Sequence, residues 1–377
     1  MSDNIPPLDI QIEILTRLPV KSLIQFRSVS KTWKSIIDTS DFIAAHHHHH
    51  TQQQHHLLVY CDDPNNYVAF VDNHSFPQHK FPITIPFLLN KFQYRRLIGS
   101  SRGLFCFYGE VANNPEGSVQ PMVVIWNPSI RRVIQVLVPG ETSNLFRSVL
   151  GFGVCPITND PKIIKIRFIS GEDNLKRISH VEVFTLSTRT WRSSYSNLPP
   201  KFIYYLDPAV DVDGFLYWQA DDMIASTNVI ISFDLTSEEF RQVNLPDKLA
   251  REDCHLVSTS KIRECLVVSH HDVEGDDFVI SVWLMEGGLE KSFSKLYSVN
   301  VSATRHTGVR GFRRNGEPII DVVKEVYEGD FSCFKFGGMC DKFVVHSYME
   351  TLLLLDQTNL TAYDETESVR FLDDSVL

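Results

Sequence analysis

The feature that most constrains the fold is a degenerate unit of about 50 residues that recurs through the middle of the chain. Each copy has an apolar run with an aromatic residue, then a turn, then a second apolar run. The aromatic residues that mark the copies are Trp126, Phe184, Phe233 and Trp283, and they lie 58, 49 and 50 residues apart. This period is typical of one blade of a β-propeller.

Residues 57–377 as a whole have the texture of a β domain. Short β-branched and aromatic runs are broken by Gly, Pro, Asn and Asp from Leu57 onward. Dividing roughly 320 residues by the repeat length predicts about six blades. A propeller accommodates many short strands without exposed sheet edges. A two-sheet β-sandwich is the alternative, because the copies are degenerate and unevenly spaced.

The first 45 residues have helical periodicity instead. Prolines 6, 7 and 19 bound a first helix from about Asp9 to Leu18. Its apolar side chains form two rows, and a single neighbouring helix can cover only one of them. The rows are Ile10, Ile14 and Leu18, and Leu8, Ile12 and Leu15.

Two more short helices are expected, one from Val20 to Val29 and one that begins after Ser30. About forty residues cannot bury this much apolar surface by themselves. The helices could therefore form a cap on the β domain, or they could present an uncovered apolar face to a partner.

The N-terminal segment closely resembles the F-box of plant F-box proteins. The resemblance covers residues 5–43 and rests on I-L-T-R-L-P-V-K-S-L followed by R-S-V-S-K-T-W; one departure is Pro6, where the family usually has Leu. It implies three helices that dock on a Skp-type adaptor, which bridges to a cullin scaffold. The positions that match the family's adaptor contacts are Pro7, Ile10, Ile14, Leu15, Leu18, Pro19, Leu23, Val29 and Trp33.

Several later segments resemble the F-box-associated, kelch-like domain of the same plant proteins. They include G-S-S-R-G-L-F-C from Gly99, W-N-P-S from Trp126 and S-Y-M-E-T-L-L at 347–353. The resemblance implies the substrate-recognition subunit of an SCF-type cullin ubiquitin ligase. Its β domain would bind a target protein, of unknown identity, for ubiquitination and proteasomal degradation.

The predicted organisation is an F-box at 1–45, a linker at 46–56 and the kelch-like β domain at 57–377. The fold class is therefore mainly β with a small all-α N-terminal domain, a three-helix F-box followed by a β-propeller-like domain. The linker is rich in His and Gln, and we expect it to be solvated. A structural metal site needs fixed spacing and mixed ligands, so we expect no metal there.

Enzymatic interpretations are weaker. Residues 99–103 fit G-x-S-x-G with Ser101 as nucleophile, but that motif requires a helix after the serine, and the following residues are strand-like. Adjacent carboxylates such as Asp221 and Asp222 lie in polar contexts, whereas a glycosidase-like propeller needs carboxylates that face each other from separate elements. We expect a non-catalytic receptor without cofactor or metal.

Charge and hydropathy limit the partners and the location. The net charge is −10, and the first 45 residues hold as many basic as acidic residues. An acidic β domain without long basic runs is unsuited to nucleic acid or anionic membranes. No membrane-length apolar run and no signal peptide are visible, so we expect a cytoplasmic or nuclear protein. The alternative function is a stand-alone propeller binding module, lectin-like or regulatory, with no ligase role.

Overall fold

The computed structural model describes most of the chain. The described residues are 6–50, 56–61, 67–112, 119–139, 148–170, 176–194, 203–253, 256–274, 277–287, 291–301, 306–322, 334–336, 343–357 and 361–362. Among them, no helix combines the length and the apolar character needed to cross a membrane.

Four helices form the N-terminal part. They are α1 (Leu8–Thr16), α2 (Val20–Val29), α3 (Lys31–Ile37) and α4 (Ser40–His50). Pro7 and Pro19 stand directly before α1 and α2, and the Ser30 hydroxyl caps α3 by accepting a hydrogen bond from the Trp33 main-chain nitrogen at 3.4 Å. The first three helices therefore begin where proline and serine predict.

The fourth helix corrects the prediction of a solvated linker from residue 46. Helix α4 continues through His50, and His46 and His47 are buried. The His46 Nε2 atom donates to the Leu18 carbonyl oxygen at 2.9 Å, which lies between α1 and α2. A run of identical polar residues carries no apolar periodicity, so the packing of one face of this run could not be predicted.

The remaining described residues form six sheets and two short helices, α5 (Phe87–Asn90) and α6 (Asp247–Ala250). In the order in which the strands lie side by side, the first sheet is β23 (Phe343–Tyr348), β1 (His56–Cys61), β2 (Tyr67–Val71) and β3 (Lys80–Ile83). The second sheet is β24 (Thr361–Ala362), β7 (Arg132–Leu137), β6 (Val119–Asn127), β5 (Leu104–Ala112) and β4 (Gln93–Ser101). The third sheet is β11 (Thr190–Ser194), β10 (Lys176–Thr185), β9 (Pro161–Ser170) and β8 (Ser148–Val154). The fourth sheet is β12 (Ile203–Val212), β13 (Phe215–Asp222), β14 (Thr227–Asp234) and β15 (Phe240–Asn244). The fifth sheet is β16 (Val257–Ile262), β17 (Cys265–Glu274), β18 (Asp277–Glu286) and β19 (Ser292–Val301). The sixth sheet is β20 (His306–Phe312), β21 (Pro318–Val322) and β22 (Phe334–Phe336).

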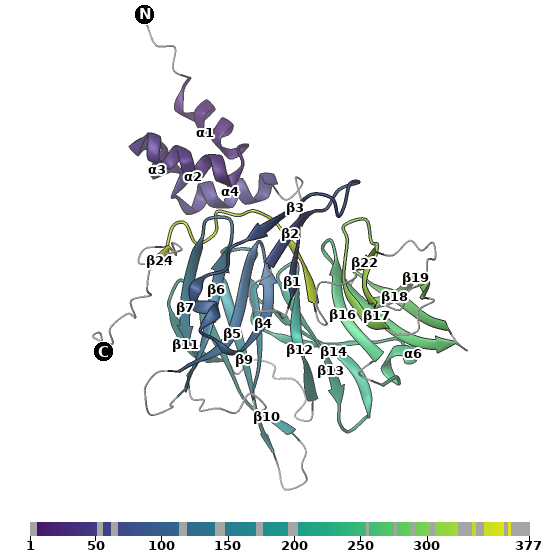
Figure 1. Ribbon diagram of the computed structural model, residues 1–377. Coiled ribbons are helices and arrows are strands. Elements are labelled where there is room, and N and C mark those ends of the chain that lie inside the picture. Colours follow the sequence, from purple (N-terminus) through teal and green to yellow (C-terminus); the bar gives the residue numbers. More distant parts are fainter. Residues whose placement is uncertain are drawn as a thin grey trace, which may run out of the picture.

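The sheets are arranged as the blades of a propeller (Figure 1). Neighbouring sheets meet through the strands β4, β8, β12, β16, β20 and β23. Five of the sheets in the described residues have four or five antiparallel strands and count as full blades, whereas β20–β22 has three strands and includes a parallel pair. The predicted β-propeller is therefore confirmed over the sandwich, and the predicted number of about six becomes five full blades.

The aromatic repeat predicted from the sequence is the repeat of the blades. Trp126, Phe184, Phe233 and Trp283 lie on β6, β10, β14 and β18, the third strand in chain order of four consecutive sheets. Each of these strands pairs with a hairpin partner on either side. The ring of Phe233, for example, lies 4.8 Å from that of Phe240 on the next strand.

A C-terminal segment joins the propeller to the helices. We call residues 349–356 the strap; it follows β23, which closes the ring by pairing with β1. Figure 1 shows the yellow strap running directly beneath α2 and α4. Its side chains Leu352, Leu353, Leu354 and Leu355 belong to one buried cluster that also contains Leu15, Leu23, Ile37, Phe42 and Ile43 of the helices and residues of β4, β5 and β6.

The W-N-P-S motif at 126–129 holds the strap in place. The fully buried Asn127 donates from Nδ2 to the carbonyl oxygens of Thr351 (3.0 Å) and Leu353 (2.7 Å). The Ser129 hydroxyl accepts from the Thr351 main-chain nitrogen at 3.0 Å and shares a hydrogen bond with the Tyr348 hydroxyl. The motif thus satisfies buried backbone groups that have no strand partner.

We expect Asn127→Ala to lower the free energy of unfolding by about 2 to 4 kcal/mol, because two buried carbonyl groups lose their donor. Urea denaturation of the full chain measures this. The control is Asn244→Ala, which changes an exposed amide on β15 and should stay within about 0.5 kcal/mol of the wild type. Equal effects of the two substitutions would contradict the role of the strap.

Candidate functional site

The helices expose large apolar side chains that the propeller does not cover. They are Leu8, Ile10 and Ile14 on α1 and Val29 at the end of α2, with exposed fractions of 49%, 42%, 51% and 70%. Ile10 and Ile14 are one helical turn apart and so lie on the same face of α1. Exposed apolar side chains gathered on a small domain are typical of a protein-binding surface.

The nine positions predicted to contact an adaptor fall into three groups in the structure. Pro7, Ile10, Ile14, Pro19 and Val29 are exposed, Leu18 and Trp33 are half-buried, and Leu15 and Leu23 are buried. Leu15 and Leu23 belong to the buried cluster that also contains the strap leucines, so their side chains are not exposed in this arrangement. Leu8 is exposed beside the predicted set and was not included in it.

The apolar side chains of α1 therefore include both buried and exposed positions, and binding of a partner by the exposed ones stays a prediction. Leu15 of α1 belongs to the buried cluster that joins the helices to the strap and the propeller, whereas Ile10 and Ile14 are open to solvent. Helix α3 is fixed against α1 because Trp33 Nε1 donates to Gln11 Oε1 at 2.8 Å. The open face is thus presented on helices that are held from the opposite side.

A second candidate site is a pocket of about 310 Å³ at the end of the propeller that carries the helices, which we call the mouth pocket. Three β-hairpins contribute their tips: those that join β4 to β5, β12 to β13 and β16 to β17. Residues 347–349 and helix α4 complete the wall. None of these residues was predicted as a site.

The three hairpins have two-residue turns, which fixes the pocket's side chains. The turn residues are Arg102-Gly103, Asp213-Gly214 and Arg263-Glu264, flanked by the pairs Ser101↔Leu104, Val212↔Phe215 and Ile262↔Cys265. Positive φ angles at Arg102, Asp213 and Arg263 are those of tight hairpin turns. At Gly103 a Cβ atom would lie 2.2 Å from the Met349 carbonyl oxygen, so only glycine allows the strap to pass.

The same hairpin geometry shows that the G-x-S-x-G motif at residues 99–103 is not a nucleophile elbow. Ser101 ends β4, and strand β5 follows it where a nucleophile elbow needs a helix. Its buried hydroxyl accepts a hydrogen bond from the Val154 main-chain nitrogen at 3.0 Å. The carboxylate pair at 221–222 also has a structural use, because Asp222 Oδ1 accepts from the main-chain nitrogens of Ile224 and Ala225.

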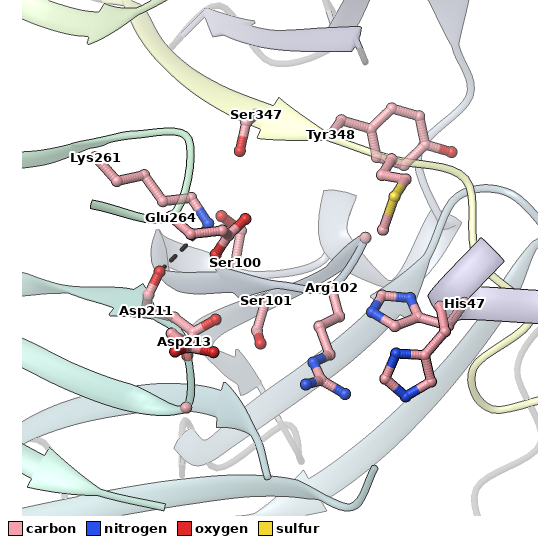
Figure 2. Close-up of a pocket in the computed structure, with 14 residues that line it drawn as sticks. His47, Ser100, Ser101, Arg102, Asp211, Asp213, Lys261, Glu264, Ser347 and Tyr348 are labelled. Carbon is pink, nitrogen blue, oxygen red and sulfur yellow. Dashed lines mark hydrogen bonds between the residues drawn. The ribbon is translucent and has the colours of Figure 1, made fainter. Parts of the chain in front are cut away.

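Charged groups of both signs line the mouth pocket (Figure 2). Arg102 donates to Asn159 Oδ1, and Lys261 Nζ donates to the Asp211 carbonyl oxygen at 3.3 Å. Asp213 and Glu264 are exposed at the rim, and Asp211 is buried at 8% exposure. Burial raises the pKa of the Asp211 carboxyl group to about 6.

Helix α4 contributes two histidines to the wall of the pocket. His47 is buried, and burial together with the nearby Arg102 charge lowers its pKa to about 4. The imidazole is therefore neutral at physiological pH. Among the described residues, no three His, Cys, Asp or Glu side chains are grouped so that they could hold a metal ion.

Comparison with known proteins gives two family matches. A model of the F-box associated beta propeller domain matches residues 56–320, and a model of the F-box domain matches residues 7–44. The chain is similar to the putative F-box protein At1g32420 of Arabidopsis thaliana, with 27% identity across 76% of this chain and 87% of the relative. It is also similar to the F-box protein At5g18160 of Arabidopsis thaliana, with 29% identity across 86% and 76%.

Among solved structures, the chain resembles the beta-propeller domain of the trilobed protease from Pyrococcus furiosus. The identity is 15%, the TM-score is 0.38, and the match covers 70% of this chain and 69% of the other. A likeness at this level bears on neither the activity nor the ligand of this chain.

Truncation of two neighbouring residues of α1 should destabilise the fold to very different extents. We expect Leu15→Ala to lower the free energy of unfolding by about 2 to 5 kcal/mol, because a buried side chain leaves a cavity. Ile14→Ala, a truncation of a half-exposed side chain, should cost less than about 1 kcal/mol. Denaturation by urea compares the two, and equal losses would contradict the orientation of α1.

The buried Asp211 carboxyl group should make stability depend on pH. Its pKa in the folded state is raised to about 6 by burial, above the unfolded value, so its contribution to stability falls as pH rises from 4 to above 6. We expect Asp211→Asn to stabilise the fold by about 1 to 3 kcal/mol at pH 7.5 and by less at pH 4.5.

Urea denaturation at the two pH values tests this, with Asp213→Asn as the control at an exposed carboxylate. The control should change little at either pH. If Asp211→Asn has the same effect at pH 7.5 and pH 4.5, no buried carboxylate titrates there.

Proposed function

This chain belongs to the family of proteins with an F-box associated beta propeller domain, and we propose that it is the substrate-recognition subunit of an SCF-type cullin ubiquitin ligase. In this proposal the F-box helices bind a Skp-type adaptor and, through it, a cullin scaffold. The propeller holds a target protein for ubiquitination and proteasomal degradation. The observation that supports the adaptor role is the uncovered apolar face of the F-box helices.

The physical argument for an adaptor is the cost of leaving this face in water. Burial of a large aliphatic side chain contributes about 1.5 to 3 kcal/mol relative to exposure. Leu8, Ile10, Ile14 and Val29 are each exposed by two fifths or more, so a partner that covers them gains several kcal/mol. The helices are already packed on the strap from the other side, so little ordering of the helices opposes binding.

The F-box substrate-receptor family is generally non-catalytic, and this chain's contribution is proximity. A receptor that holds the target beside a charged ubiquitin carrier raises the effective concentration of the reacting groups. The buried cluster shared by helices and propeller supports a fixed geometry between adaptor and target. We further propose a kelch-like classification of the repeat and a location in the cytoplasm or nucleus.

The test is direct binding of the purified full chain to a plant Skp-type adaptor, measured by isothermal titration calorimetry. We expect Ile14→Asp to weaken binding roughly 100-fold or more, because a buried unpaired charge costs several kcal/mol. Ile224→Asp is the matched control, since Ile224 is 68% exposed in the turn between β13 and β14 and lies away from the helices.

Tight binding that only Ile14→Asp removes would support the receptor role. Absence of binding by a folded wild-type chain would overturn it and favour the stand-alone propeller module. The earlier-predicted contact Leu15 is unsuitable for this test, because its substitution by Asp would disturb the fold itself.

A further inference from the structure

We propose that the mouth pocket recognises a basic side chain, lysine or arginine, of the target protein. This inference rests on the proposed function and adds where and by what chemistry the propeller holds its target. It starts from which charged groups of the pocket already have partners and which do not.

The two cations of the pocket are occupied by the protein itself. Arg102 donates to the Asn159 side chain, and Lys261 donates to the main-chain oxygen of Asp211. In contrast, within the described part of the chain the rim carboxylates of Asp213 and Glu264 form no hydrogen bond and no ion pair. The groups of the pocket that remain free to form hydrogen bonds are therefore acceptors. They favour a ligand that donates hydrogen bonds, and in particular a cation.

Two buried polar groups, on two different elements, also favour a ligand in the pocket. Asp211 of β12 and His47 of α4 are only 8% and 7% exposed, and the atoms Asp211 Oδ1 and His47 Nδ1 have no hydrogen-bond partner. Buried polar atoms without partners are rare in folded proteins and call for an explanation. A ligand that brings a donor into the pocket explains Asp211 Oδ1, since a carboxylate only accepts, and it explains His47 Nδ1 in the tautomer that carries its proton on Nε2.

The arrangement of the pocket agrees with a single inserted side chain. Figure 2 shows Asp211, Asp213 and Glu264 on one side of the pocket together with Lys261, and His47 on the other side beyond Arg102. A volume of about 310 Å³ is at the lower limit for small-ligand pockets, which suits one long side chain with its main chain. The hairpin turns fix the carboxylates, so binding orders little of the pocket.

The net charge of the rest of the domain also favours a basic ligand. The whole net charge of −10 lies beyond residue 45, so the propeller attracts basic segments before contact. Burial raises the pKa of the Asp211 carboxyl group even though the nearby Lys261 and Arg102 lower it, so its ionised form would be stabilised further by additional positive charge. An approaching ammonium or guanidinium group supplies it and favours the ionised carboxylate.

The experiment titrates the purified full chain against two blocked pentapeptides, acetyl-Gly-Gly-Arg-Gly-Gly-amide and its Glu counterpart, followed by ligand-detected NMR. We expect the Arg peptide to bind in the high micromolar to millimolar range and the Glu peptide at least tenfold more weakly. The pocket variant Asp213→Asn/Glu264→Gln should weaken Arg-peptide binding at least tenfold.

The matched control is Asp247→Asn/Glu286→Gln, which removes the same two charges from exposed positions outside the pocket. It should retain wild-type affinity. Equal binding of the Arg and Glu peptides, no binding of either, or equal losses in the pocket and control variants would overturn the inference.

The adaptor-deficient variant Ile14→Asp separates this inference from the proposed function. It should bind the Arg peptide as the wild type does, because Ile14 is not part of the pocket. A chain that binds the adaptor but discriminates no basic peptide keeps the receptor role and loses the pocket assignment. A chain that binds the Arg peptide but no adaptor gives the opposite result.

Discussion

The burial of four consecutive leucines between the helices and the propeller is the interaction on which the rest of the structure depends. Leu352 to Leu355 share one apolar cluster with the inner side of α1–α4 and with the blade that contains β4–β7. Asn127 secures the backbone of that segment by donating to two of its carbonyl oxygens. The outward orientation of Ile14 and the position of His47 over the mouth pocket both follow from this packing.

Much of the fold could be predicted because its signals are local. The aromatic residue on the third strand of a blade, as at Trp126 or Phe233, repeats wherever the same packing is needed. The prediction was wrong where burial is decided elsewhere: His46 is buried beside the Leu18 carbonyl between α1 and α2, and His47 is buried against the hairpins of the propeller. The count of full blades also differs, since dividing the length by the repeat treats all sheets alike, whereas the sheet β20–β22 has three strands in the described residues.

For the candidate sites too, features that depend on nearby sequence could be predicted, and features that depend on distant segments could not. Ile14 and Leu15 are adjacent and equally apolar, yet one is half-exposed and the other buried, because the cluster that buries Leu15 is built from segments that lie far apart in the sequence. The mouth pocket was even harder to predict from the sequence. Of its hairpins only Asp213-Gly214 carries a strong turn signature, and the convergence of three separate turns is a property of the ring, not of any one segment.

The closure of the ring through β23 has a consequence for how the protein is made. Strand β1 is synthesised early, but its partner β23 and the strap leave the ribosome only after the strands of the intervening blades. Until then the F-box helices have no leucines to pack against, and their inner apolar face is exposed. Correct presentation of the F-box therefore depends on translation of the strap, so that a chain terminated before the strap lacks the leucines against which its own helices are packed.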